Sequence, residues 1–207
     1  MSLDTYLMFV VASLVVVMIP GPSVMLVVSQ ALSSGKSSVA PLAAGVGLGD
    51  LVAMTLSFLG LGAILAASAF TFTILKWVGA LYLAYLGVKM FRSSTSLSAD
   101  DGQTTGVSGR SQFLSAFITT ALNPKSIIFF IAFVPQFVST EAALAPQFVI
   151  LGATFLVLGV LNAAMYAVFA GKLRSILRDP KALKRFNRVG GSLLVGAGVL
   201  TAAARHG

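Results

Sequence analysis

The sequence has 207 residues and a mass of 21.4 kDa, with 57% apolar residues, 10% charged residues and a mean hydropathy of +0.95. A soluble domain carries about 25% charged residues, so this composition excludes an ordinary soluble globule. Uncharged runs at residues 5–35, 51–75 and 142–171 each exceed the length of about 20 residues that a bilayer-spanning helix needs. The sequence therefore predicts an all-α integral membrane protein.

The net charge of +8 is concentrated, because seven of the fourteen basic residues lie in segment 172–188. Basic residues at the ends of apolar runs are typical of membrane topology signals, and the segment itself is suited to anionic lipid headgroups. We therefore predict no nucleic-acid partner. The chain has no cysteine, and its only histidine, His206, stands next to the end of the sequence. These counts exclude disulfides and thiolate metal sites, and we predict no cofactor.

Six apolar segments are predicted to span the membrane, which makes the protein multi-pass. They are residues 5–28, 40–66, 71–90, 113–138, 147–170 and 189–204. The connections after the first, third and fifth spans hold eleven Lys and Arg residues, against two on the opposite side. Basic residues accumulate in cytoplasmic loops, so both termini are predicted to lie outside the cytoplasm.

An internal repeat supports the sixth span, which is the least hydrophobic. The pattern of Gly, Val and Leu at residues 78–88 recurs at 189–199 with an offset of 111, and Pro22 and Pro124 lie 102 positions apart. Two halves of three spans each must have opposite orientations, which is a construction of secondary transporters. We predict one transmembrane transporter domain over 1–207, with a first repeat at about 1–92, a Ser/Thr/Gly-rich linker at about 93–112 and a second repeat at about 113–207.

Two spans carry residues that interrupt a helix. Pro20-Gly21-Pro22 lies within the first span, and Asn123-Pro124-Lys125 lies at a related place in the fourth. Proline lacks a backbone donor and crowds the carbonyl of the residue four positions earlier, and the freed carbonyls need a partner or a water-lined cavity. A packing kink is one interpretation. Paired broken helices around a binding site explain both interruptions together.

Asp50 and Lys125 are the two charged residues deepest in the predicted spans. They lie about 15 Å and 18 Å from the span ends at 1.5 Å per residue. A charge at the bilayer centre costs about 2.5–3.5 kcal/mol on insertion scales. One hypothesis is a structural salt bridge between the two. The other is that Asp50 exchanges a proton while Lys125 and Asn123 hold the carboxylate of a substrate.

Weaker candidates share helix faces. Asn162 and Tyr166 are four residues apart, and Tyr82 and Tyr85 are three apart. Such pairs either contact a substrate or bond neighbouring helices. The run of Gly45, Gly47 and Gly49 before Asp50 permits close helix packing or leaves clearance for a substrate.

The motifs together resemble the amino-acid exporters of the LysE/RhtB type along the whole chain. They are Pro20-Gly21-Pro22, residues 45–50 (GVGLGD), 76–89 (KWVGALYLAYLGVK), Asn123-Pro124-Lys125 with 133–137 (FVPQF), and 187–191 (NRVGG). The resemblance implies an exporter of an amino acid or close derivative in the bacterial inner (plasma) membrane, driven by the proton motive force. Members of this family export different amino acids, so the resemblance leaves the particular amino acid open.

Three other classes of function are alternatives for a membrane protein of this composition. A membrane hydrolase needs a nucleophile with a base, paired acids or a metal, and the predicted spans offer a single acid. An inorganic-ion exporter of the same fold remains an alternative, although Zn²⁺ and Cu²⁺ favour histidine or cysteine ligands. A passive channel is the third. The expected partners are an amino-acid substrate, protons and lipid, and a small six-span bundle is compatible with a homodimer.

Overall fold

A computed structural model describes residues 1–67, 107–139 and 141–172, together with isolated positions between 70 and 88 and between 179 and 196. The described residues form helices and contain no strand, as the all-α prediction requires. The helices are α1 (Leu3–Met18), α2 (Pro22–Ser34), η1 (Gly35–Ser38), α3 (Val39–Ala67), α5 (Gly109–Ala121), α6 (Pro124–Ile128), the π-helical turn η2 (Phe129–Phe133), η3 (Val134–Phe137) and α7 (Leu144–Val168).

Two helical stretches among the described residues, Pro22–Leu61 and Leu144–Val168, are long and apolar enough to cross a membrane. A third is added if Gly109–Ala121 and Lys125–Phe137, which meet at a bend of 44°, form one broken span. The predicted third and sixth spans, 71–90 and 189–204, fall mainly outside the described residues. The arrangement of six spans as two inverted repeats therefore stays a prediction.

The two interruptions follow the same local rule. Helix α1 ends at Met18 because Pro20 and Pro22 cannot donate backbone hydrogen bonds, and α2 then begins with Pro22 at a position where a missing N–H is tolerated. Helix α6 likewise begins with Pro124, after an Asn123 cap whose side-chain oxygen accepts from the Lys125 backbone N–H at 3.0 Å. Pro20 and Pro22 thus separate α1 from α2, and Asn123 with Pro124 separates α5 from α6.

Helix α5 begins at Gly109, inside the stretch 93–112 that the sequence predicted as a linker. Ser108 caps this helix, because its hydroxyl accepts from the backbone N–H of Ser111 at 3.3 Å. The cap explains why the helix starts before the apolar residues of the span. Residues 109–112 therefore belong to helix α5, and the rest of the predicted linker, up to residue 106, lies outside the described residues.

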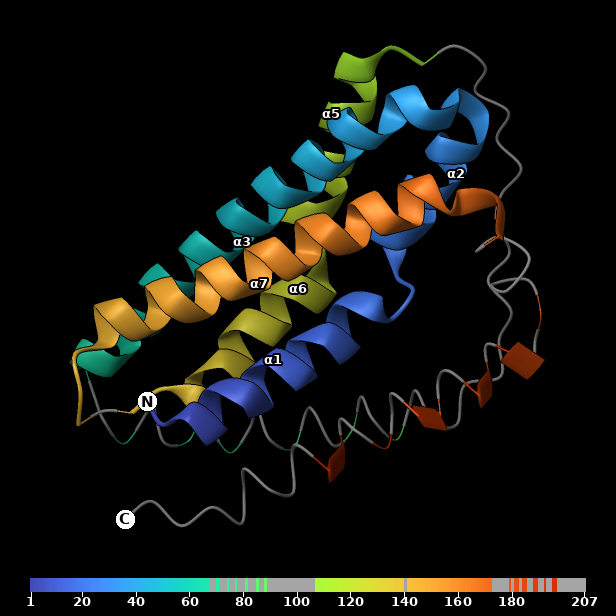
Figure 1. The fold of residues 1–207 in the computed structure, drawn as a ribbon. Helices are drawn as coiled ribbons and strands as arrows, with labels where there is room; N and C mark the ends of the chain where they lie inside the picture. Colours follow the sequence, from blue (N-terminus) through green and yellow to red (C-terminus); the bar gives the residue numbers. More distant parts are fainter. Residues whose placement is uncertain are drawn as a thin grey trace.

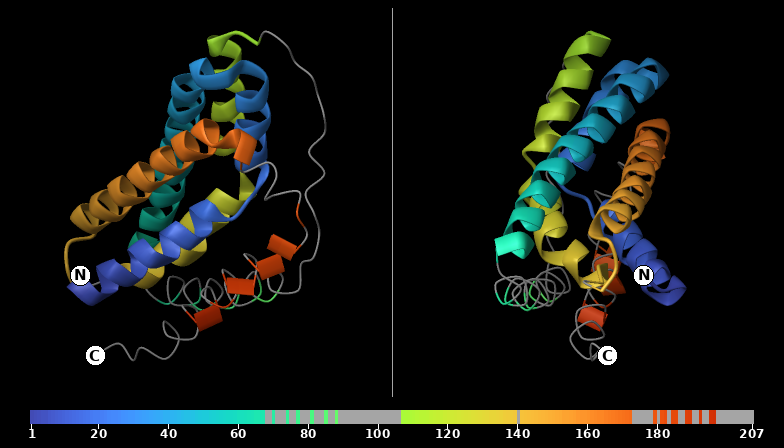
Figure 2. Two further views of the ribbon diagram at one scale, coloured as in Figure 1. Left: turned by 45° about the vertical axis from the view of Figure 1, so that its right-hand side comes forward. Right: turned by 90° about the vertical axis from the view of Figure 1, so that its left-hand side faces the viewer.

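The interrupted segments run antiparallel through the bundle (Figure 1). The chain crosses upward through α1 and α2, turns at η1 and returns downward through α3. It later crosses downward a second time through α5, α6, η2 and η3. The break between α1 and α2 and the break between α5 and α6 lie at a similar level in this view. Figure 2 shows α3 lying between α5 and α7, so α3 presents one face to each of these helices.

Glycines allow α3 to pack closely on both neighbours. A Cβ atom at Gly49 would lie 2.8 Å from the carbonyl oxygen of Phe117 on α5, and one at Gly47 would lie 2.7 Å from a methyl carbon of Val160 on α7. Contacts this short require the neighbour to move. These glycines serve helix packing, which is the first of the two interpretations drawn from the sequence.

Aromatic side chains fill the half of the bundle around α1. The ring of Phe9 on α1 packs edge-on against that of Phe137, with their centroids 5.4 Å apart. The ring centroid of Phe129 lies 4.6 Å from that of Phe133 and 5.0 Å from that of Phe155 on α7. Such pairs contribute about 0.5–1.5 kcal/mol each beyond their buried area. This cluster fixes α1 against η2, η3 and α7, and so fixes the position of the end of α1.

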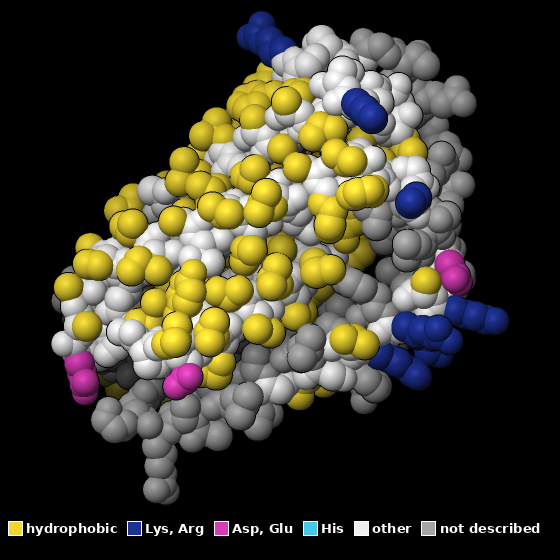
Figure 3. Space-filling model, viewed as in Figure 1, with side chains coloured by type: hydrophobic (Ala, Val, Ile, Leu, Met, Phe, Trp, Pro, Cys, Tyr) yellow, Lys and Arg dark blue, Asp and Glu magenta, His cyan; other side chains and the backbone are white. Residues whose placement is uncertain are grey.

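The outer face of the bundle is apolar in its middle and charged at its ends (Figure 3). Large apolar side chains on α3 and α7 point outward, with Leu59 67% and Val149 69% exposed. Among described residues, Lys36 on η1 and Arg110 at the start of α5 belong to one end, whereas Asp4 on α1 and Glu141 before α7 belong to the other. An apolar band between two charged ends is the surface expected of a protein embedded in lipid.

Candidate functional site

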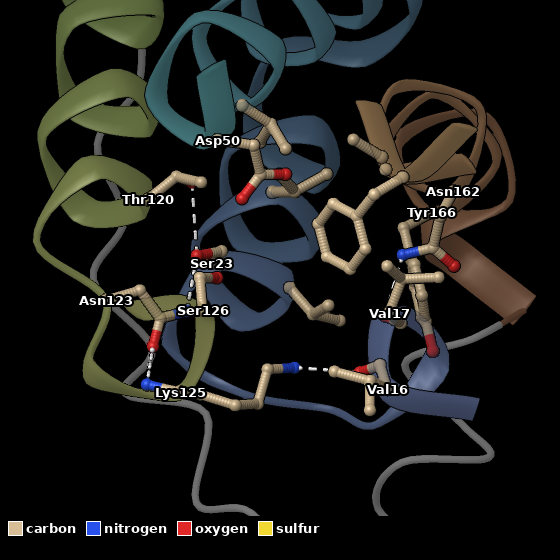
Figure 4. A pocket seen from close by; sticks show the side chains of 16 residues that line it. Val16, Val17, Ser23, Asp50, Thr120, Asn123, Lys125, Ser126, Asn162 and Tyr166 are labelled. Atoms are coloured by element: carbon tan, nitrogen blue, oxygen red, sulfur yellow. Dashed lines mark hydrogen bonds between the residues drawn. The ribbon is translucent and has the colours of Figure 1, made fainter. Parts of the chain in front are cut away.

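A cavity opens where the two helix breaks face each other. Its walls come from α1, α2, α3, α5, α6 and α7, and its empty volume is about 480 Å³ with its open mouth included. Figure 4 shows polar side chains from both breaks and from α3 and α7 turned toward this space.

Lys125 caps the end of the broken helix α1. Its ammonium nitrogen Nζ donates to the carbonyl oxygen of Val16 at 3.1 Å and to that of Ile19 at 3.0 Å. The side chain passes beside Gly21, where a Cβ atom would lie 3.5 Å from Nζ. The cation therefore lies at the negative end of the α1 dipole, where positive charge is stabilised.

Helix α7 caps the two remaining carbonyls of the last turn. Asn162 Nδ2 donates to the carbonyl oxygen of Val17 at 2.9 Å, and the Tyr166 hydroxyl donates to that of Met18 at 2.9 Å. The spacing of Asn162 and Tyr166, one helical turn apart, places them on two consecutive carbonyls. The shared face predicted from the sequence is real, and in this structure it serves the end of α1.

Ser23 joins the first break to the second. Its hydroxyl oxygen accepts from the Thr120 hydroxyl at 3.1 Å and from the Asn123 amide Nδ2 at 3.1 Å. Thr120 and Asn123 are both buried, on either side of the point where α5 ends. The two interruptions are thus tied by side-chain hydrogen bonds as well as by Lys125.

Asp50 supplies the acidic group of the cavity. It is 5% exposed, its carboxylate points into the cavity (Figure 4), and the Ser126 hydroxyl interacts with that carboxylate. Gly159 of α7 leaves room for it, because a Cβ there would lie 2.9 Å from Oδ2. Lys125 lines the same cavity, with its ammonium hydrogen-bonded to the carbonyls of Val16 and Ile19. Both hypotheses drawn from the sequence for Asp50 and Lys125, the structural salt bridge and the separate roles in transport, therefore stay predictions.

The predicted site residues divide into three groups. Asp50, Asn123, Lys125, Asn162 and Tyr166 line the cavity, and Pro20, Gly21, Pro22 and Pro124 make the adjoining breaks. Tyr82 lies outside the described residues. Tyr85 is 57% exposed and is not part of the cavity wall.

Sequence reasoning missed four polar or small residues of the wall: Ser23, Thr120, Ser126 and Gly159. A signal for three of them was present, since Ser23 follows Pro22 directly, Ser126 follows Lys125, and Thr120 precedes Asn123 by three positions. Small polar residues beside a break are placed to bond freed backbone groups or each other. Among the described residues, no three His, Cys, Asp or Glu side chains gather in a way that could hold a metal ion.

Comparison with known proteins assigns the chain to a family. Residues 14–205 match the LysE type translocator family, so the chain belongs to this family of membrane transport proteins.

Individual relatives cover almost the full length. The homoserine/homoserine lactone efflux protein of Salmonella typhi is 31% identical over 206 residues, covering 100% of both chains. The leucine efflux protein of Klebsiella pneumoniae is 30% identical over 91% of this chain and 88% of its own. A membrane protein of Vibrio cholerae without an assigned function is 31% identical over 99% of this chain and 100% of its own. No solved structure matches the chain.

Proposed function

We propose that this protein is a secondary transporter that exports an amino acid or a close derivative from the cytoplasm by proton antiport. The observation that carries the proposal is the cavity between two broken helices, which holds one buried acid and one lysine, Asp50 and Lys125. Broken helices that meet near the membrane midplane are a recurring construction of substrate sites in transporters. The efflux of homoserine and leucine by relatives supports the same class of substrate.

The lining of the cavity favours an amino acid with an uncharged side chain. Apart from Asp50 and Lys125, its wall consists of neutral groups, with Val24, Val27 and Phe155 on the apolar side. The Lys125 ammonium can pair with the carboxylate of an amino acid, and the apolar wall suits an uncharged side chain. In this proposal Lys125 and Asn123 receive the carboxylate, and Asp50 carries the proton.

Counterflow in proteoliposomes tests this function. Purified protein is reconstituted into vesicles loaded with unlabelled amino acids, and uptake of each labelled amino acid is compared with that of divalent cations. Uptake of a neutral amino acid well above that of protein-free vesicles supports the proposal. Exchange of divalent cations without any amino acid would instead identify the inorganic-ion alternative.

Membrane orientation is a separate expectation. We propose six spans in the inner membrane with both termini outside the cytoplasm, because the end of the bundle with Lys36 and Arg110 carries the basic residues that accumulate in cytoplasmic loops. Reporter fusions at Ser98, Glu141 and the C-terminus measure this. Cytoplasmic activity is expected at Ser98 alone, and a cytoplasmic signal at the C-terminus would rule out the six-span arrangement.

Water access to the breaks can be measured with cysteines. The sequence has no native cysteine, and a Cβ at Gly21 has no neighbour closer than 3.5 Å, so Gly21→Cys fits. Cysteines at Gly21 and Asn123 are expected to react with a small aqueous thiol reagent, and added substrate is expected to slow the reaction.

Leu161→Cys is the matched control, since Leu161 is exposed on the outward face of α7 and should face lipid. It is expected to stay unreactive. If Gly21→Cys and Asn123→Cys were as inert as this control under every condition, the breaks would be packing kinks without a water-filled site.

A further inference from the structure

The end of α1 offers a cluster of backbone carbonyls that lack their usual helical donors, although the Val16 carbonyl keeps one hydrogen bond from the Ile19 N–H at 3.3 Å. In a continuous helix the carbonyls of Val16 and Met18 would accept from positions 20 and 22, but both positions are prolines and have no N–H. The carbonyl of Ile19, beyond the last helical residue, is likewise left over. Such groups must be paired in an apolar environment.

A primary ammonium group already occupies part of this cluster. Lys125 Nζ donates to the Val16 and Ile19 carbonyls at 3.1 Å and 3.0 Å, with the negative end of the α1 dipole behind them. The contact demonstrates that an –NH₃⁺ group fits here in size, charge and hydrogen bonding. The α-amino group of an amino acid is the same chemical group.

We propose that the end of α1 is the binding site for the amino group of the exported solute, and that Lys125 holds this site with its own ammonium until the solute displaces it. This inference rests on the proposed function and adds to it the position of the amino group. It also gives Lys125 two successive partners, first the α1 carbonyls and then the carboxylate of the solute.

Displacement leaves every charged group with a partner only if the solute carries both an amino group and a carboxylate. An amine alone would take the α1 carbonyls but leave the Lys125 ammonium unpaired in a buried site. A carboxylate alone would draw Lys125 away, leaving the Ile19 carbonyl without this donor and the Val16 carbonyl with only the 3.3 Å hydrogen bond from the Ile19 N–H. Since unpaired buried charges and carbonyls are both costly, the exchange selects for molecules with both groups.

Truncation of Lys125 opens the site to an external probe. Lys125→Ala removes three methylene groups and the ammonium, which n-propylammonium closely replaces. We expect the thermal unfolding midpoint of the purified variant to fall by about 4 °C or more, and millimolar n-propylammonium to restore at least half of the loss by binding the folded state. n-Propanol, which lacks the charge, and tetramethylammonium, which cannot donate hydrogen bonds, should restore nothing.

The wild-type protein and Lys36→Ala are the matched controls. Lys36 is exposed on η1, away from the cavity, so neither protein should respond to n-propylammonium. If Lys125→Ala does not fold, Lys125→Met replaces it. Ammonium ion is then the probe, because the methionine fills the space of the methylene groups and lacks only the charged nitrogen. Failure of n-propylammonium to stabilise Lys125→Ala, failure of ammonium ion to stabilise Lys125→Met where that variant is used, or equal stabilisation by tetramethylammonium would overturn the proposal.

Competition between an amino acid and n-propylammonium tests whether the amino group of the amino acid binds at the end of α1. The amino acid with the largest wild-type counterflow is expected to stabilise Lys125→Ala. When n-propylammonium is present at 100 times the dissociation constant of n-propylammonium, the apparent affinity of the variant for this amino acid should fall at least about tenfold. Independent binding of the two would overturn the assignment of the amino group to the end of α1, although amino-acid export would stand. Absence of any amino-acid counterflow would instead contradict the proposed function, and the response to n-propylammonium would still decide whether an ammonium site exists.

Discussion

Asp50→Asn is expected to abolish amino-acid transport driven by a pH gradient while leaving exchange of amino acid for amino acid measurable. The amide has nearly the shape of the carboxylate and can remain beside Gly159 and Ser126, but it cannot take up and release a proton. The fold should persist, because the amide keeps the size of the side chain and Lys125 keeps its hydrogen bonds to the carbonyls of Val16 and Ile19. Proteoliposome assays of driven uptake and of exchange measure the two activities separately.

Asp4→Asn provides the matched control, because Asp4 is the exposed acid near the start of α1 and should leave both activities unchanged. Thermal unfolding of both variants tests for structural damage. A further variant, Asp50→Asn with Lys125→Met, tests the alternative of a structural ion pair, which predicts recovery of stability in the double variant. Driven transport at the parent rate in Asp50→Asn would end the assignment of Asp50 as the proton carrier.

Gly49→Ala is expected to destabilise the bundle by about 1–3 kcal/mol, the usual cost of overpacking. A Cβ there would lie 2.8 Å from the Phe117 carbonyl oxygen and 3.0 Å from the Ala121 backbone nitrogen. Because these are backbone atoms, α5 itself must move, and with it the cap at Asn123 that shapes the cavity. The measurement is the midpoint of thermal unfolding in detergent, beside substrate affinity.

Gly60→Ala separates packing from helix propensity. Gly60 lies on the same helix α3, and a Cβ there meets no described atom within 4 Å. Alanine is favoured over glycine in a helix by about 1 kcal/mol, so this variant should be as stable as the parent or more stable. Equal responses of Gly49→Ala and Gly60→Ala would show that α3 and α5 are not in the close contact described above.

The positions of the helix breaks could be predicted from the sequence because proline acts locally. Pro20, Pro22 and Pro124 remove donors wherever the rest of the chain lies, so α1 and α2, and α5 and α6, separate where the sequence indicated. The membrane class followed as directly from the long uncharged runs. Asp50 and Lys125 were recognisable for the same reason, since charge inside an apolar span is costly.

The pairing of those residues could not be read from the sequence, because it depends on how the helices pack. Spacing along the chain says nothing of whether Lys125 contacts Asp50 or the carbonyls of Val16 and Ile19. The hydrogen bonds of Asn162 and Tyr166 to α1 bridge more than 140 positions and likewise need the tertiary structure. Nothing in the sequence indicated a role for Gly159, because its role is to leave space for the Asp50 carboxylate by having no side chain.

The central claim, amino-acid export by proton antiport, is tested most directly by recording the pH inside proteoliposomes while an amino acid enters. With the protein reconstituted at equal internal and external pH, addition of the amino acid identified by counterflow should make the interior more alkaline, because each molecule that enters drives protons out. Vesicles with Asp50→Asn should show no change. Entry of the amino acid into wild-type vesicles with no change of internal pH would contradict the account.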